Sequence, residues 1–406
     1  MTAFAPKFLV LLLFGVSCLP SFDPAAAQTA ATQSNFALIK DAAESIAAGD
    51  LQKAETELKT VLAANPSEFR AMSLLGVVRA QQHREAEAEQ LFKQAIQQKP
   101  DFASAHVDLG LLYVQINRES DAVPEFQEAL RIDPGRSDAL SSLLNVWRAQ
   151  ARDALRSGDL EKALAVLIQA HKMAPQDADG TFEFGMVALR MSLLPDAIQA
   201  FQEVLSVRKD DPGALYGLGR AQIELSKYQE ARESFERYVQ LRPKDASGHY
   251  ALGFALQALQ QTPEARRQFE HSIELQPMQT ESYFQLGLMD LEGNNLESAA
   301  SRFNRVLERD PKHAGALTGM GRVEFQRKDY QKAVELLQSA IASDPSLREA
   351  HYYLGMSYAR LGKKDDSEKE LQLASQLEHE EVEKRRVVIK ILDSNDPDAK
   401  QLDEKK

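Results

Sequence analysis

The histidines and carboxylates of this chain are the residues best suited to chemistry, either as metal ligands or as general acids and bases. The sequence contains eight His, 60 Asp and Glu residues and one Cys, Cys18. His379 is followed by Glu380 and Glu381, but the second His of a zinc-binding helix is missing. His106, His249 and His351 lie too far apart along the chain to form one metal site. We therefore predict no metal site and interpret these three His as packing residues.

Two pairs of glycines could begin a nucleotide-binding loop. Gly217-Leu218-Gly219 and Gly319-Met320-Gly321 both lack the third Gly of a dinucleotide fingerprint, and neither follows a strand-like segment. The sequence also has no phosphate loop, no Gly-x-Ser-x-Gly motif and no Cys placed as a nucleophile. We predict no catalytic residue and no cofactor.

The charge of the chain argues against two classes of partner. With 48 basic and 60 acidic residues the net charge is −12, and no block is rich in Lys and Arg. An acidic chain of this kind is poorly suited to bind nucleic acid or anionic membrane surfaces. We expect a protein or peptide partner instead.

Pro and Gly recur at a fixed interval through most of the chain. Pro66, Pro100 and Pro134 are 34 residues apart, as are Pro243, Pro277, Pro311 and Pro345. A series of Gly residues shares this interval, at 76, 110, 185, 219, 253, 287, 321 and 355, with one gap of two periods plus seven residues. Self-similarity at this period indicates a solenoid of helix–turn–helix units, which favours a binding scaffold over an enzyme.

Each repeat carries small and bulky residues at fixed positions. If Asn35 is position 1, repeats begin at residues 35, 69, 103, 137, 178, 212, 246, 280, 314 and 348. Position 8 is usually Gly, position 20 is usually Ala, and position 24 is Phe or Leu. Small residues let two helices approach closely, and the bulky residue fills the space beside them. We expect helices near residues 35–48 and 52–64 and then every 34 residues, each pair joined by a turn that Asp or Asn can cap.

This pattern resembles the tetratricopeptide repeat (TPR) family. The third repeat shows its residues in Leu109-Gly110, Tyr113, Ala122, Phe126, Ala129 and Pro134. The resemblance covers residues 35–381 in ten repeats and implies an all-α, right-handed α-solenoid. Some repeats depart from the pattern: Lys209 and His379 replace the Pro at position 32.

The fourth repeat, residues 137–177, contains the seven extra residues. Because helix-spaced apolar residues continue from Leu140 to Leu155, we place the insertion in the first helix of the repeat. Seven residues are close to two turns and add roughly 10 Å of helix. This helix either projects beyond its neighbours, with the only Trp, Trp147, as a binding residue, or adjusts the stacking of the repeats.

In the TPR family the first helix of each repeat lines the concave side of the solenoid, where partners bind. Here positions 5 and 9 of repeats 5–10 are rich in aromatic residues, Met and Arg, as peptide-binding surfaces often are. Tyr at position 5 also serves packing in the family, so binding and packing both remain open. The predicted partner-binding residues are Phe182, Met186, Tyr216, Arg220, Tyr250, Phe254, Phe284, Leu288, Arg322, Tyr352, Tyr353 and Met356.

The N-terminal residues have the features of a secretory signal, which we assign to residues 1–27. Lys7 precedes a short apolar segment, and Ala25-Ala26-Ala27 offers a cleavage site before Gln28. A degenerate lipobox ending at Cys18 is the alternative, with Cys18 as the lipidated residue and the only membrane anchor. We assign residues 28–34 to a polar linker and residues 382–406 to a capping helix with a charged tail.

These observations favour an exported bacterial TPR protein, located in the periplasm or secreted, or else held on a membrane as a lipoprotein. The function that we predict is that of a non-catalytic scaffold or adaptor of the cell envelope. The alternative is a carbohydrate-binding or enzyme-associated TPR subunit, for example in polysaccharide synthesis or export, because aromatic surfaces can also stack on sugars.

Overall fold

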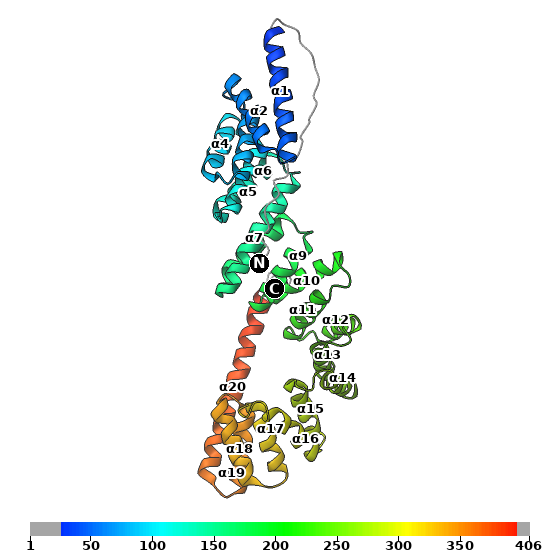
Figure 1. Cartoon of the computed structure of the whole chain (residues 1–406). Coiled ribbons are helices and arrows are strands. Elements are labelled where there is room, and N and C mark those ends of the chain that lie inside the picture. The colour runs from blue at the N-terminus through cyan, green and yellow to red at the C-terminus, as the bar shows by residue number, and fades with distance from the viewer. Residues whose placement is uncertain (1–25, 396–406) are drawn as a thin grey trace, which may run out of the picture. The chain divides into compact units, whose positions relative to one another are not determined.

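The computed structural model describes the backbone of residues 26–395 and the side chains of residues 35–380. This part of the chain is all helical, which confirms the predicted fold class (Figure 1). Its helices are α1 (Ala26–Ala47), α2 (Leu51–Ala64), α3 (Phe69–Gln81), α4 (Glu85–Gln98), α5 (Ala103–Gln115), α6 (Glu119–Ile132), α7 (Ser137–Ser157), α8 (Leu160–Met173), α9 (Ala178–Arg190), α10 (Leu194–Val207), α11 (Pro212–Glu224), α12 (Tyr228–Leu241), α13 (Ala246–Ala258), α14 (Thr262–Leu275), α15 (Thr280–Glu292), α16 (Leu296–Leu307), α17 (Ala314–Gln326), α18 (Tyr330–Ser343), α19 (Arg348–Arg360) and α20 (Lys364–Asn395). Odd-numbered helices are the first helices of the repeats, which we call A helices, and even-numbered helices are the B helices.

The chain divides between Met191 and Ser192 into two compact units. Unit 1 contains α1–α9, and unit 2 contains α10–α20. Within unit 2, the A helices α11, α13 and α15 lie on one side, and the B helices α12, α14 and α16 lie on the other (Figure 1). Each A helix therefore contributes to a surface that is separate from the one formed by the B helices.

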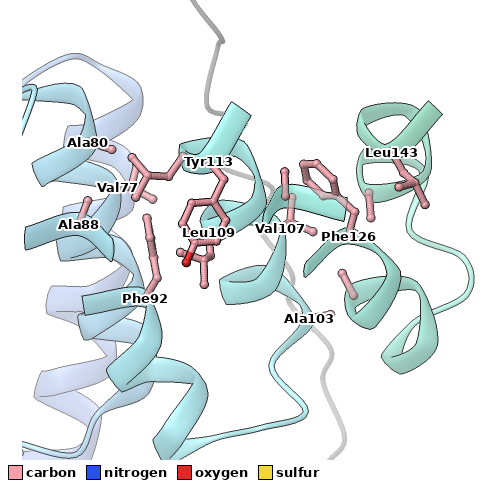
Figure 2. Packing of buried hydrophobic residues seen from close by; sticks show 14 of the residues in the cluster. Val77, Ala80, Ala88, Phe92, Ala103, Val107, Leu109, Tyr113, Phe126 and Leu143 are labelled. Carbon is pink, nitrogen blue, oxygen red and sulfur yellow. The ribbon is translucent and has the colours of Figure 1, made fainter. Parts of the chain in front are cut away.

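The repeating small and bulky residues pack as the sequence predicts. The Ala at position 20 is fully buried in eight repeats, at residues 54, 88, 122, 197, 231, 265, 299 and 333. Phe92 and Phe126, at position 24, are also fully buried and point between neighbouring helices (Figure 2). A Cβ atom on Gly76 would lie 2.6 Å from Phe92 Cε1, and one on Gly110 would lie 2.7 Å from Phe126 Cε1. The Gly at position 8 is therefore required by the ring of position 24.

The turns between A and B helices share one backbone conformation. In each turn the second residue after the A helix, or the first after α7, has φ between 57° and 81°, whether it is Gly49, Gly158 or a non-Gly residue such as Ser192 or Lys328. Asp50 and Asp159 cap their B helices by accepting a hydrogen bond from the backbone N–H three residues later. In the turn before α16 the left-handed residue is Asn294, and Asn295 makes no side-chain cap.

Helix α7 contains the predicted insertion as one continuous helix of 21 residues. Its N-terminal half packs in the core with Leu143, Leu144 and Trp147, and its C-terminal half packs in a second core cluster with Ala151 and Ala154. Trp147 is only 3% exposed. The interpretation of α7 as a projecting helix that presents Trp147 is therefore wrong, because the helix is packed along both halves.

The N-terminal helix α1 is longer than predicted. It begins at Ala26, so residues 28–34, which we assigned to a polar linker, have a helical backbone. The Ala residues of this segment favour the helix, and it has no Pro or Gly to stop it. Residues 1–25, with Cys18 and most of the signal segment, lie outside the described residues.

Helix α20 also continues beyond its predicted end. The separate capping helix that we expected after residue 381 is not formed, because α20 runs without a break for 32 residues. His379 stands where most repeats have Pro, and no Gly or Pro interrupts the segment from Lys364 to Asn395. The C-terminal half of α20 extends past α17–α19 (Figure 1). Across residues 26–395, no helix is long and apolar enough to cross a membrane.

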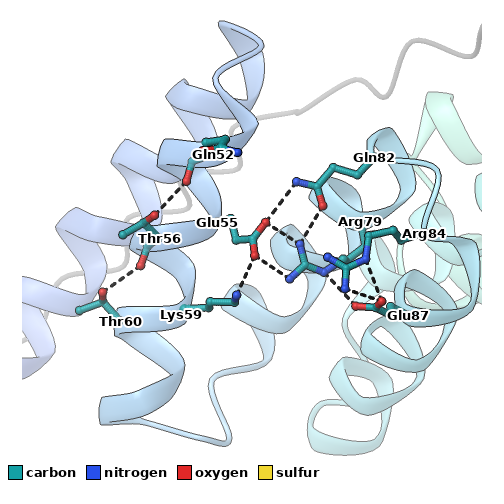
Figure 3. Close-up of polar contacts among 9 residues, drawn as sticks. All are labelled: Gln52, Glu55, Thr56, Lys59, Thr60, Arg79, Gln82, Arg84 and Glu87. Carbon is teal, nitrogen blue, oxygen red and sulfur yellow. Dashed lines mark hydrogen bonds and ion pairs between the residues drawn. The ribbon is translucent and has the colours of Figure 1, made fainter.

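Buried polar residues at position 11 tie several A helices to their neighbours. In the second repeat the side chain of Arg79 is 5% exposed and donates to both carboxylate oxygens of Glu55 on α2, at 2.7 and 2.9 Å. It also contacts Glu87 on α4 at 3.1 Å (Figure 3). In the eighth repeat Asp290 has the opposite charge and binds Arg266 and Arg302, at 2.8 and 3.1 Å. These ion pairs join three helices at one point.

Candidate functional site

The predicted partner-binding residues all lie on A helices. Phe182 and Met186 are on α9 of unit 1, and the other ten are on α11, α13, α15, α17 and α19 of unit 2. Unit 2 therefore brings ten of the twelve residues onto one series of A helices. We call these ten residues the A-helix face of unit 2: Tyr216, Arg220, Tyr250, Phe254, Phe284, Leu288, Arg322, Tyr352, Tyr353 and Met356.

The aromatic residues at position 5 are mainly packing residues in three repeats. Tyr216, Tyr250 and Phe284 are half-buried, and each ring lies against the Phe at position 24 of its own repeat. The centroids of these ring pairs are 5.7, 5.9 and 6.1 Å apart, respectively. Burial raises the pKa of both Tyr216 and Tyr250, as expected for phenols held between helices. These rings are therefore less available to a partner than exposed ones.

The residues at position 9, together with Tyr352, are more accessible. Phe254 is 36% exposed, Met186 is 40% exposed and Tyr352 is 42% exposed, although all three are large and apolar. Leu288 and Met356 are half-buried beside them in the repeat pattern. Exposed apolar residues on one series of A helices suit a peptide-binding surface, so Phe254 on α13 and Tyr352 on α19 are the best anchors in unit 2.

The two Arg residues at position 9 have different surroundings. Arg322 forms an ion pair of 2.7 Å with Glu349 and lies over the ring of Tyr353, 5.2 Å from its centroid. Arg220 is exposed, and among the described residues it forms no ion pair. Opposite charges at position 9 of one repeat and position 2 of the next were the sequence signal for the Arg322–Glu349 pair, and we missed it.

The last two repeats hold a compact aromatic cluster. Tyr353 packs against Phe325 with centroids 5.6 Å apart and against Tyr352 with centroids 5.2 Å apart. Phe325 also contacts Tyr330 on α18, at 5.5 Å. Tyr353 is thus a supporting residue that holds the exposed ring of Tyr352 in place.

The three position-4 histidines serve packing, as predicted. In each, Nδ1 contacts a polar side chain of the B helix, and Nε2 contacts the carbonyl oxygen of the preceding Pro. For His106 these partners are Glu125 at 2.7 Å and Pro100 at 3.2 Å. Burial lowers the pKa of His106, but its hydrogen bonds outweigh this effect and raise the pKa above its usual value. Within the described residues, no group of three or more His, Cys, Asp or Glu could hold a metal ion.

Sequence comparison gives the family of the chain. A profile described as "Tetratricopeptide repeat" matches residues 45–101, 148–210, 182–246, 250–314, 285–348 and 318–377, and a second of the same description matches residues 79–146. Together these matches span well over half of the sequence. The chain belongs to the tetratricopeptide repeat family. Proteins of this family generally mediate protein–protein interactions.

Several solved TPR structures resemble parts or most of the chain. MamA from Desulfovibrio magneticus RS-1 is 24% identical, with a TM-score of 0.40, over 42% of this chain and 96% of that one. YrrB, described as a TPR protein with an unusual peptide-binding site, is 27% identical, with a TM-score of 0.38, over 45% and 95%. The Cut9–Hcn1 tetramer of APC/C gives 12% identity and a TM-score of 0.48 over 92% and 97%. No curated protein sequence gives a significant match.

Proposed function

We propose that the chain is a non-catalytic adaptor that binds a protein or peptide partner on the A-helix face of unit 2. The observation that carries this proposal is the exposure of Phe254 and Tyr352, at 36% and 42%, in an array whose other aromatic residues are largely packed. Such rings provide large contact areas at a low cost in side-chain entropy. Leu288 on α15 and Met356, on α19 with Tyr352, add half-buried apolar surface to this face.

Replacing both Phe254 and Tyr352 by Ser should weaken peptide binding by roughly a thousandfold, because hot-spot residues contribute ~2 kcal/mol or more each. The probes are peptides selected on the full-length wild-type chain from a displayed library of random dodecapeptides, with affinities measured by fluorescence anisotropy. Met278→Ser is the matched control, since Met278 is 63% exposed and lies in unit 2 outside the A helices.

Circular dichroism should show equal helicity for the double variant and the wild type. A folded double variant with wild-type affinity would exclude this face as the binding surface. A library selection on the wild-type chain that enriches no peptide would also exclude it.

We also propose that the mature protein acts in the bacterial cell envelope, in the periplasm or after secretion. Lys7, the apolar segment that follows it and Ala25-Ala26-Ala27 support this proposal. Intact-mass analysis of protein recovered from cells should then give an N-terminus at Gln28. A chain that keeps Met1 would argue against export, and a lipid-modified Cys18 would instead indicate a membrane-anchored lipoprotein.

A further inference from the structure

The A-helix face of unit 2 carries one cationic side chain that no partner among residues 35–380 neutralises. Arg220 and Arg322 occupy the same position in the sixth and ninth repeats. Glu349 neutralises Arg322 at 2.7 Å, and the side chain of Arg322 is only 14% exposed. Arg220 is exposed, and no described carboxylate lies within ion-pair distance of it. Arg322 therefore serves the structure, whereas Arg220 is available to pair with a group on a partner.

The neighbours of Arg220 do not cancel its charge. Glu224, one helical turn further along α11, is exposed and is not paired with it among the described residues. An Arg that precedes a Glu by four residues is also the weaker order for such a pair. Tyr216, one turn before, is close enough for the Arg220 charge to lower the pKa of its phenol against the larger effect of burial. Asp245 acts on the same phenol in the opposite direction.

The apolar neighbour of Arg220 on the next repeat is Phe254. Both residues are at position 9, on α11 and α13, and these A helices contact each other. The exposed ring of Phe254 thus follows the free guanidinium by one repeat along the face. A guanidinium binds carboxylates in a bidentate manner, and a ring beside it excludes water from that pair.

We propose that the partner peptide carries an Asp or Glu side chain that pairs with Arg220, together with an apolar side chain that covers Phe254. This inference rests on the proposed peptide-binding function of the same face. A side-chain carboxylate within the peptide is the better fit, because adjacent repeats lack the Lys and Asn residues that hold a terminal carboxylate in some TPR proteins.

The test starts from peptides selected on the wild-type full-length chain from the dodecapeptide library. The tightest binder is synthesised with an amidated C-terminus, once as selected and once with each Asp or Glu changed to Asn or Gln. Loss of the acidic residue should weaken binding to the wild type about tenfold, a typical effect for a charge pair that is partly desolvated. The Arg220→Gln variant should bind both peptides equally.

Arg322→Gln is the matched control, because it removes the same residue type from the same position of another repeat. The Arg322→Gln variant should keep the full difference in affinity between the acidic peptide and its neutral form. Selected peptides without Asp or Glu would overturn this inference, and so would an Arg220→Gln variant that still binds the acidic peptide more tightly than its neutral form. Peptide binding that still depends on Phe254 and Tyr352 would nevertheless leave the proposed function intact. Failure of both Phe254 and Tyr352 to affect binding would instead overturn the proposed function.

Discussion

Replacing Gly319 by Leu is expected to destabilise the protein by about 3 kcal/mol, because the new side chain overpacks a fully buried ring. The ring of Phe303 lies between two glycines of successive A helices. A Cβ atom on Gly319 would lie 2.5 Å from Phe303 Cζ, and one on Gly287 would lie 2.7 Å from Phe303 Cε1. The ring therefore cannot move away from the new side chain without meeting α15, and α17 must shift instead.

The loss should be measured as a lower midpoint in urea denaturation of the full chain, followed by circular dichroism. Gly135→Leu is the control, because Gly135 is exposed and the nearest atom to an added Cβ is a carboxylate oxygen at 3.5 Å. Phe303→Leu should partly rescue Gly319→Leu, since Leu337 already fills position 24 of the next repeat. An unchanged midpoint for Gly319→Leu would contradict this packing. A double variant whose loss of stability equals the sum of the losses from Gly319→Leu and Phe303→Leu would also contradict it.

The damage should also extend beyond the substituted helix. In a repeat array each unit is stabilised mainly by its neighbours, so the loss of one interface weakens the helices on both sides. Gly253→Leu and Ala231→Phe should act in the same way. A Cβ on Gly253 would lie 2.8 Å from Phe269, and Ala231 is fully buried. Their effects should be roughly 1–3 kcal/mol, because each substitution adds volume to a core that is already filled.

Repetition explains why the fold could be predicted from the sequence. The residues at positions 8, 20 and 24 recur in nearly every repeat. A residue in one repeat that departs from the pattern therefore does not change the prediction, because the other repeats agree. The starts of the A helices agree with the structure from Phe69 to Arg348. The two ends have no second copy to confirm them, and there the predicted linker and the predicted capping helix were wrong.

The turn conformation shows what repetition of residue type cannot reveal. The same left-handed position holds Gly49 in one repeat and His83, Gln260 or Lys328 in others. A non-Gly residue costs about 1 kcal/mol there, which packing of the two helices can supply. The position is thus fixed by tertiary structure, and the residue found there carries little information about it.

The candidate site was only partly predictable for a similar reason. Position 5 carries an aromatic residue both where the family packs and where a partner could bind, so Tyr250 and Tyr352 look alike in the sequence. Their surroundings separate them: Tyr250 packs against Phe269, and Tyr352 is 42% exposed. Likewise, only the three-dimensional partner of each Arg distinguishes Arg220 from Arg322. Exposure and pairing depend on contacts between repeats, which a repeat-by-repeat comparison does not include.

Replacing Glu55 by Leu should destabilise the protein by about 3 kcal/mol at neutral pH, because it leaves the buried guanidinium of Arg79 with one charged partner, the exposed Glu87. Lys59→Met is the matched control. Lys59 also pairs with Glu55, at 2.7 Å, but it is 59% exposed and should contribute less than ~1 kcal/mol. Thermal denaturation of both variants measures the difference, and equal losses would show that the burial of Arg79 is unimportant.

The same ion pair predicts how stability depends on pH. Hydrogen bonds from Arg79, then from Lys59 and Gln82, hold the pKa of Glu55 far below its usual range. Since the pKa is lowered in the folded state, the stabilisation is complete above the unfolded value of about 4.5 and is lost as the pH falls below it. The difference in the free energy of unfolding between the wild type and Glu55→Leu should therefore become smaller as the pH falls from 7 to 3.

The double variant Glu55→Leu/Arg79→Leu gives the decisive comparison. If the cost of Glu55→Leu comes from an uncompensated buried charge, removing Arg79 as well should restore most of the stability. The seventh repeat supports this expectation, because Leu256 occupies the position of Arg79 there and is 5% exposed within an intact apolar core. A double variant that is as unstable as Glu55→Leu would instead mean that the lost ion-pair contacts, and not an unpaired buried charge, cause the loss of stability. The ion pair would then itself hold α2, α3 and α4 together.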